Sequence, residues 1–282
     1  MVVKRIPKMP PDTVTPATTK PRKKTFVVED WITNDGQRII LYADTGMGKT
    51  SLALLAPNPV FIGTDEGGAD FYHPETGEII KRVPNIENFG DIRAAIQQPG
   101  LFDAYETVVL DTITIMQDWA IDHVVRTIPT EKGGIVNNIL GYGYNKGWNH
   151  LYDVMKLLLV DLERLIHQDK NVIIIAQAAI HNVPNPDGEN FIRTGLRLHV
   201  DKNADTESLY CEWADHLLKI AYSEAKAKEG KITGTTDRAI FTQPKLHFRA
   251  KTRPLPKPIP AVVEFTDKAD DAIWQWIFQG DE

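Results

Sequence analysis

The stretch that most constrains the fold is Ala43-Asp44-Thr45-Gly46-Met47-Gly48-Lys49-Thr50. An apolar run at 39–42 precedes it and a helix-forming run follows it, so the glycines lie between an expected strand and an expected helix. Gly46 and Gly48 permit positive φ, which lets backbone N–H groups turn toward an anion at the positive end of the helix. This is the pattern of a P-loop, with Ala43 at the first glycine position, and it predicts a nucleoside triphosphate site. The alternative is a glycine turn that precedes a helix by chance.

Each polar residue of this loop has an expected role. Lys49 reaches the β- and γ-phosphates, and the Thr50 hydroxyl binds Mg²⁺. Asp111 ends an apolar run and would hold the hydration shell of the metal beside Thr50, or else it opens an ordinary turn. The expected contacts of bound ATP are Ala43, Asp44, Thr45, Gly46, Met47, Gly48, Lys49, Thr50 and Ser51.

Apolar runs and amphipathic runs alternate along the first two thirds of the chain. Strands are expected at 58–64, 107–111 and 172–176, and helices at 89–98 and 151–167. This alternation predicts an α/β fold with a mainly parallel central sheet flanked by helices. The later segments are expected to be a loop or hairpin at 181–203, a helix at 205–220, a surface loop at 226–238, a strand at 246–253 and a final helix at 269–279.

Composition places the chain among globular proteins. Its 282 residues are 42% hydrophobic, which is enough for a core. The single cysteine, Cys211, excludes an internal disulfide framework and a cysteine-based zinc site. No apolar run approaches the roughly 18 residues of a membrane span, and residues 1–24 lack the apolar core of a signal peptide. A soluble cytoplasmic protein without a membrane partner is expected.

Charge is unevenly distributed along the chain. Residues 1–24 contain seven Lys or Arg and one acid, a net +6, which leaves −12 for the rest of a chain whose total is −6. The same segment is rich in Pro and Thr without hydrophobic periodicity. It is predicted to be a disordered basic arm ahead of one folded domain at 25–282, which opens with a short strand at 25–31. The arm is interpreted either as a solubilising tail or as a contact for nucleic acid or a neighbouring subunit.

Two further polar residues are candidates for the hydrolytic step. Glu66 follows the second expected strand, so its carboxylate would lie at the same sheet edge as the P-loop and orient the attacking water. Asp65 is a rival for this role, and a solvated acidic turn is the alternative for both. Gln177, at the tip of the strand 172–176, could sense the γ-phosphate and signal to the loop that follows, or it could cap that loop from a buried position.

The segments Gly46–Thr50, Asp65–Gly68, Val108–Thr112 and Ile175–Gln177 together resemble a RecA-like ATPase core. The chain also resembles the phage-encoded P-loop proteins of the Sak type in the segment 141–144, in Trp148 and in the leucine-rich helix expected at 151–167. Those are RecA-core proteins linked to single-strand annealing and recombination. The resemblance covers roughly 39–253. It implies a sheet of order 5-1-4-3-2, Glu66 as catalytic carboxylate and Gln177 as coupling residue. It also implies a single-strand DNA-binding protein as partner and, for a phage-encoded chain, a bacterial host cytoplasm as location.

RecA-like recombinases hold single-stranded DNA in two loops, and the resemblance implies that these lie at 126–148 and 181–203. Cations in the loops would bind phosphates, and aromatic rings would stack on bases. Solvated loops whose rings pack into the domain are the alternative. The expected DNA contacts are Arg126, Lys132, Tyr142, Tyr144, Lys146, Arg193, Arg197 and Lys202.

Lys251 and Arg253 end the expected strand at 246–253. In ring and filament ATPases, a cation at such a place can reach the γ-phosphate of a neighbouring subunit. The two residues are therefore candidates for contact with the γ-phosphate bound by a neighbouring subunit of a homo-oligomer. The alternative is that they are solvated charges at the end of a strand. No separate N-terminal domain for polymerisation is evident, so assembly would depend on the arm or the core.

The leading hypothesis is an ATP- and Mg²⁺-dependent single-stranded DNA-binding recombination protein that anneals or exchanges strands, with hydrolysis stimulated by DNA. One alternative is a DNA motor or helicase loader built on the same core. Another is a nucleotide-gated interaction protein with little turnover. A metabolic kinase is a weaker alternative, because no clear lid or acceptor motif follows the P-loop.

Overall fold

The computed structural model describes residues 28, 36–63, 72–186, 188–223, 226–228, 231–233, 237–255, 257–267 and 269–278. The chain divides into two units, 1–33 and 34–282, and every helix and strand given below belongs to the second. The predicted arm at 1–24, the predicted strand at 25–31 apart from Val28, and the acidic pair Asp65 and Glu66 lie outside the described residues.

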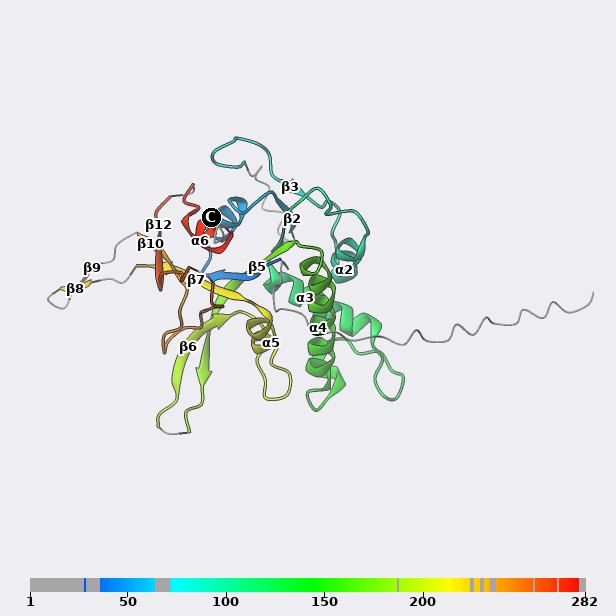
Figure 1. Ribbon diagram of the computed structural model, residues 1–282. Coiled ribbons are helices and arrows are strands. Elements are labelled where there is room, and N and C mark those ends of the chain that lie inside the picture. Colours follow the sequence, from blue (N-terminus) through cyan, green and yellow to red (C-terminus); the bar gives the residue numbers. More distant parts are fainter. Residues whose placement is uncertain are drawn as a thin grey trace, which may run out of the picture. The chain divides into compact units, whose positions relative to one another are not determined.

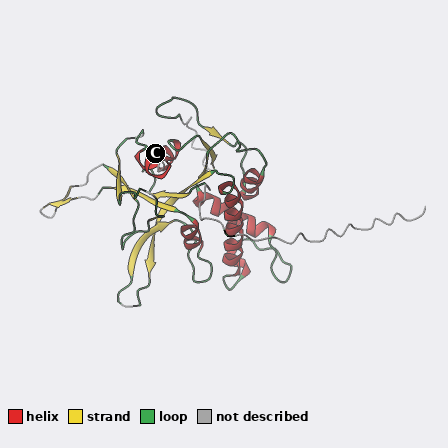
Figure 2. Cartoon of the chain, viewed as in Figure 1, coloured by secondary structure: helices red, strands yellow, loops and turns green. Residues whose placement is uncertain are grey.

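Five parallel strands form the centre of the main sheet (Figures 1 and 2), and their apolar residues are mostly buried because helices cover both faces. They are β1 (Arg38–Ala43), β2 (Pro59–Gly63), β4 (Thr107–Asp111), β5 (Asn171–Val183) and β7 (His216–Tyr222). Their spatial order is β7-β1-β5-β4-β2. This order matches the predicted 5-1-4-3-2 when the five strands are numbered along the chain. The register sets Ala43 opposite Gln177 and Gly63 opposite Asp111, so the polar strand ends meet at one sheet edge.

Shorter strands extend the sheet beyond the predicted five. At one edge β3 (Lys81–Arg82) pairs with β2. At the other edge β10 (Arg238–Phe241) pairs antiparallel with β7, and β12 (Val262–Phe265) pairs antiparallel with β10. The two-residue strand β11 (Lys251–Thr252) pairs with the start of β7. Off the central path, β6 (Phe191–Leu196) forms an antiparallel hairpin with the far half of β5. A separate pair consists of β8 (Lys226–Lys228) and β9 (Lys231–Thr233).

Helices cover the two faces of the sheet unequally. One face packs on α1 (Lys49–Leu54) and α6 (Ala272–Phe278), which are joined where the Trp274 indole N–H donates to the Leu52 carbonyl at 2.8 Å. The opposite face carries the larger core (Figure 1). Its elements are α2 (Phe89–Gln97), α3 (Ile113–Thr127), the 3₁₀ helix η1 (Ile139–Tyr142), α4 (Lys146–Ile166) and α5 (Thr206–Trp213).

Three predicted elements need correction. The predicted helix at 205–220 is wrong in its second half, because α5 ends at Trp213 and the buried run of β7 pairs with β1 instead. The predicted strand at 246–253 is almost entirely wrong, since only Lys251 and Thr252 form a strand and a tight turn joins Lys245 to Phe248. The predicted surface loop at 226–238 contains β8 and β9. The excursion at 181–203 is in part the β5–β6 hairpin, one of its two predicted forms.

Candidate nucleotide site

The P-loop connects the buried end of β1 to the start of α1. Gly46 and Gly48 adopt left-handed φ values of 80° and 89°, which a residue with a side chain adopts only under strain. Gly48 also occupies the N-cap position of α1, so the first N–H groups of that helix open into the loop. The loop therefore presents backbone donors at a helix N-terminus, which fits the phosphates of a nucleotide.

Lys49 lies inside this loop and is only 6% exposed. Its Nζ donates to the carbonyls of Ala43 at 3.0 Å and Asp44 at 2.8 Å, and to Gln177 Oε1 at 3.2 Å. Burial lowers the pKa of Lys49, while the carboxylates of Asp111 and Asp44 act in the opposite direction. The ammonium group thus donates to neutral oxygens. An anionic phosphate that replaced them would accept a stronger, charge-assisted hydrogen bond.

The residues present fit a magnesium ion. Thr50 is the second residue of α1, and its Oγ1 donates at 2.7 Å to Oδ2 of Asp111, the last residue of β4. A hydroxyl and a carboxylate at this separation supply the hard oxygen donors, or second-layer partners of bound water, that Mg²⁺ prefers. Among the described residues no cluster of three or more His, Cys, Asp or Glu forms another metal site.

Gln177 connects the P-loop to the opposite face of the sheet. Its Oε1 accepts from Lys49 and, at 3.4 Å, from the Thr45 hydroxyl. Its backbone N–H donates to Thr114 Oγ1 in α3 at 3.1 Å, and its carbonyl accepts from the Arg197 N–H at 2.8 Å, just after β6. One residue therefore contacts the loop, the helix after Asp111 and the base of the hairpin.

A lysine that the sequence analysis missed lies next to the loop. Lys219, opposite Tyr42 in the β1–β7 register, lines a cavity of about 110 Å³ together with Asp44 and Thr194. Burial lowers the pKa of Lys219, and the Asp44 carboxylate opposes this shift. The sequence did not indicate Lys219, because its segment was predicted to be a helix. Only the pairing of β7 with β1 places Lys219 beside the P-loop.

The two predicted DNA loops meet on one side of the sheet. In Figure 1 the β5–β6 hairpin and the segments before α4 and α5 all extend below the sheet. Trp148 stacks on His199 with ring centroids 3.9 Å apart and planes 9° apart, and Asn145 Nδ2 donates to Asp201 Oδ2 at 2.9 Å. These two contacts join the start of α4 to the segment that follows β6.

The predicted DNA contacts in the first loop are not equivalent. Tyr144 is 98% exposed, whereas the Tyr142 hydroxyl donates to the Val124 and Ile128 carbonyls at 2.9 and 2.5 Å, which ties its ring to α3. Lys146 pairs with Glu131 at 2.7 Å. Exposed cations in the two loops are Arg126, which lies 4.0 Å from Asp122, and Lys132, Arg197 and Lys202. Arg193 is half-buried in β6, opposite His181.

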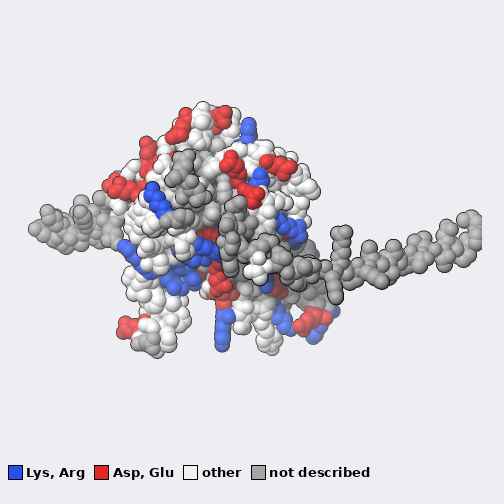
Figure 3. Space-filling view, viewed as in Figure 1, with Lys and Arg blue, Asp and Glu red and all other residues white. Residues whose placement is uncertain are grey.

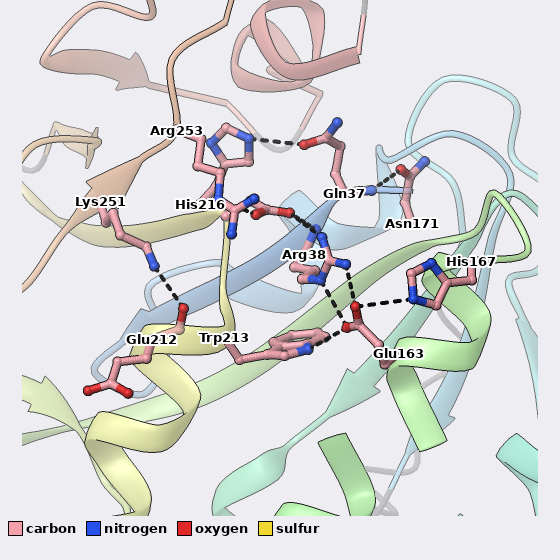
Figure 4. Close-up of polar contacts among 11 residues, drawn as sticks. Gln37, Arg38, Glu163, His167, Asn171, Glu212, Trp213, His216, Lys251 and Arg253 are labelled. Carbon is pink, nitrogen blue, oxygen red and sulfur yellow. Dashed lines mark hydrogen bonds and ion pairs between the residues drawn. The ribbon is translucent and has the colours of Figure 1, made fainter. Parts of the chain in front are cut away.

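Lys251 and Arg253 lie near the end of α5 and the start of β7 (Figure 4). Lys251 Nζ donates to the Cys211 and Glu212 carbonyls at 2.8 and 3.2 Å, so it caps the C-terminus of α5. Arg253 pairs at 2.6 Å with Asp215, which also binds Arg38 at 3.1 Å. Asp215 immediately precedes β7, so this cluster lies at the edge of the sheet opposite Lys49. These contacts give both cations structural roles within the chain.

The fold and the site together define a RecA-like P-loop ATPase. The family AAA_24, described as an AAA domain, matches residues 35–254, and the chain belongs to this family. Family membership indicates ATPase activity and implies nucleotide and Mg²⁺ binding. None of the curated proteins matches the chain.

Two solved structures resemble the chain at low sequence identity. The flagellar accessory protein FlaH from Methanocaldococcus jannaschii is 10% identical, with a TM-score of 0.43 and coverage of 82% of this chain and 85% of that one. The KaiC-like protein PH0186 from Pyrococcus horikoshii is 14% identical, with a TM-score of 0.38 and coverage of 82% of this chain and 90% of that one.

No described helix is long and apolar enough to cross a membrane.

Proposed function

We propose that this protein is an ATP-dependent recombination protein of the phage-encoded Sak type, which binds single-stranded DNA and anneals or exchanges strands. The observation that carries the proposal is the position of Gln177. It contacts Lys49 in the P-loop with its side chain, and its main chain contacts the base of the β5–β6 hairpin at Arg197. A change at the phosphates is thereby transmitted to a loop predicted to bind DNA.

In the nucleotide step, Lys49 and the loop N–H groups bind phosphates, and Thr50 with Asp111 would hold Mg²⁺. When bound there, the ion would supply positive charge for the phosphate oxygens during hydrolysis. Glu66 remains the predicted carboxylate that orients the attacking water. When phosphate replaces Gln177 as a partner of Lys49, the Gln177 amide is released to turn toward the γ-phosphate. This release couples nucleotide state to the Thr114 and Arg197 contacts.

The DNA step uses the surface formed by the two loops. Tyr144 presents its ring to solvent, and a base that stacks on such a ring gains about 1–3 kcal/mol. Lys132, Arg197 and Lys202 are exposed in the two loops and supply cations for the phosphates. On the visible face, Asp and Glu gather at the upper rim, and lower down Lys and Arg lie beside the strands with Asp and Glu among them (Figure 3). The Lys and Arg side chains of this lower part are available to a phosphate backbone.

The proposal is tested by fluorescence anisotropy of a labelled oligo-dT, with and without Mg²⁺-ATP, at 50 and 200 mM salt. Tyr144→Ala is the test variant and Tyr152→Ala, a tyrosine further along α4, is the matched control. We expect Tyr144→Ala alone to weaken binding about tenfold or more, and wild-type binding to fall steeply with salt. Equal binding by all three proteins would contradict the proposed DNA surface.

A second candidate function is a nucleotide-gated interaction protein. It is favoured by the exposed apolar side chains of Ile135 and Leu140, which are 84% and 70% exposed; Leu140 lines a pocket together with Tyr144. This function predicts ATP binding with slow turnover and no response to DNA. A DNA motor or helicase loader would instead show translocation or transfer of another protein onto DNA.

A further inference from the structure

Arg238 contacts the P-loop from outside, on the strand β10 that extends the parallel sheet. Its Nη1 donates to the Met47 carbonyl at 3.2 Å. Its guanidinium lies over the Phe265 ring, 4.6 Å from the ring centroid, because the β10–β12 register places Phe265 directly opposite. Phe265 is fully buried in the core beneath α1, so the guanidinium rests on a fixed platform.

The packing around Gly48 shows how closely Arg238 approaches the loop. A Cβ added at Gly48 would lie 2.6 Å from Arg238 Nη1 and 3.0 Å from Phe265 Cε1. The φ of 89° is what makes Gly48 a glycine position, and a side chain added there would also have to displace the Arg238 guanidinium. Arg238 and Phe265 therefore pack directly against the Met47–Gly48 segment of the P-loop.

We propose that Arg238 is a positioning residue for nucleotide binding, acting through this peptide. In a planar trans peptide the C=O and the following N–H point in opposite directions. A guanidinium that holds the Met47 carbonyl outward therefore directs the Gly48 N–H inward, to where Lys49 and the phosphates meet. The proposal rests on nucleotide binding at the P-loop. It adds that the antiparallel strands β10 and β12 set the geometry of the loop, although Arg238 itself touches no phosphate.

The test compares Arg238→Met, which keeps an apolar stem on Phe265 and removes the donor, with Arg238→Lys, which keeps the charge. Lys257→Met is the matched control, because Lys257 also lies over a ring, 4.7 Å from the Trp276 centroid, and makes no contact with the P-loop among those described. Kd for Mg²⁺-ADP and Mg²⁺-ATP is measured by calorimetry, with kcat at saturating ATP and the unfolding temperature without nucleotide as companion readouts.

We expect Arg238→Met to bind both nucleotides about tenfold more weakly, since ADP and ATP share the phosphate that a P-loop amide serves. Arg238→Lys should be intermediate, kcat should change less than twofold, and Lys257→Met should match the wild type. Affinity within twofold of wild type in folded Arg238→Met, or an equal loss in Lys257→Met, would overturn the inference and leave the proposed function intact. Should Arg238→Met fail to fold, unchanged affinity in Arg238→Lys would overturn it. A wild-type protein that binds neither nucleotide would overturn both.

Discussion

Lowering the pH from 7.5 to 5 should destabilise the protein through one buried histidine. His216 is fully buried on β7, where Nε2 lies 3.2 Å from Gln37 Oε1 and Nδ1 has no hydrogen-bond partner in the part of the chain that the structure describes. Burial lowers the pKa of His216 to about 4; Asp215 raises it, and Arg253 and Lys251 lower it.

The sign and size follow from that pKa. Because the folded pKa lies below the ordinary value of 6.5, the unfolded chain binds the proton more readily, and stability falls as pH drops from 6.5 toward 4. A difference of about 2.5 pKa units corresponds to about 3 kcal/mol when fully expressed, and to about 2 kcal/mol at pH 5. The contribution of His216 to the free energy of unfolding should therefore fall by about 2 kcal/mol between pH 7.5 and pH 5.

Urea unfolding at pH 7.5, 6 and 5 in the wild type and in His216→Gln isolates this contribution. Carboxylates such as Glu163, whose pKa is lowered mainly by its hydrogen bond from Arg38, titrate in both proteins and cancel in the difference. The wild type should lose about 2 kcal/mol more than the variant between pH 7.5 and pH 5. Parallel pH profiles would refute the reasoning, because they would mean that His216 protonates equally easily in both states.

Three further changes have definite expected outcomes. Lys49→Ala should abolish ATP binding in calorimetry while the circular dichroism spectrum is unchanged, and residual hydrolysis at the wild-type rate would refute the site. Asp161→Ala should lower the free energy of unfolding by about 1.5–3 kcal/mol in urea, because Arg93 at 2.5 Å and Gln97 at 2.8 Å lose a carboxylate that is only 2% exposed. An unchanged free energy of unfolding would contradict this expectation. Arg193→Ala combined with Arg197→Ala should weaken oligo-dT binding and leave ATP affinity unchanged. The slope of log affinity against log salt concentration should become shallower by the amount expected for the loss of about two phosphate contacts. An unchanged salt slope would remove the hairpin from the DNA surface.

The central strands and the P-loop context were predictable because both depend on local patterns: buried runs of β-branched residues indicate parallel strands, and the motif at 43–50 lies between a strand and a helix. The order of the strands is not a local property, and it was predicted only from the resemblance to RecA-like ATPases. Asp111 and Gln177 follow such runs, so their convergence on Lys49 and Thr50 follows from parallel strands ending at one edge.

The residues that prediction missed depend on pairing between distant segments. Leu209, Trp213 and Leu217 have helical spacing, yet the backbone after Ala214 pairs with β1, which places Lys219 beside the P-loop. Arg238 reaches Met47 from 191 residues away in sequence, and no local pattern encodes such a contact. Lys251 and Arg253 were predicted from a strand that the structure largely lacks, and their partners in and just after α5 could not be read from spacing.

Coupling between the nucleotide site and the DNA surface is measured by the rate of ATP hydrolysis by the purified protein with and without oligo-dT at low salt, in the wild type and in Gln177→Ala. We predict that DNA stimulates hydrolysis severalfold or more in the wild type, and that Gln177→Ala binds ATP and DNA but loses the stimulation. Hydrolysis that ignores DNA in the wild type, or stimulation that survives in Gln177→Ala, would contradict the proposed coupling between the nucleotide site and the DNA surface.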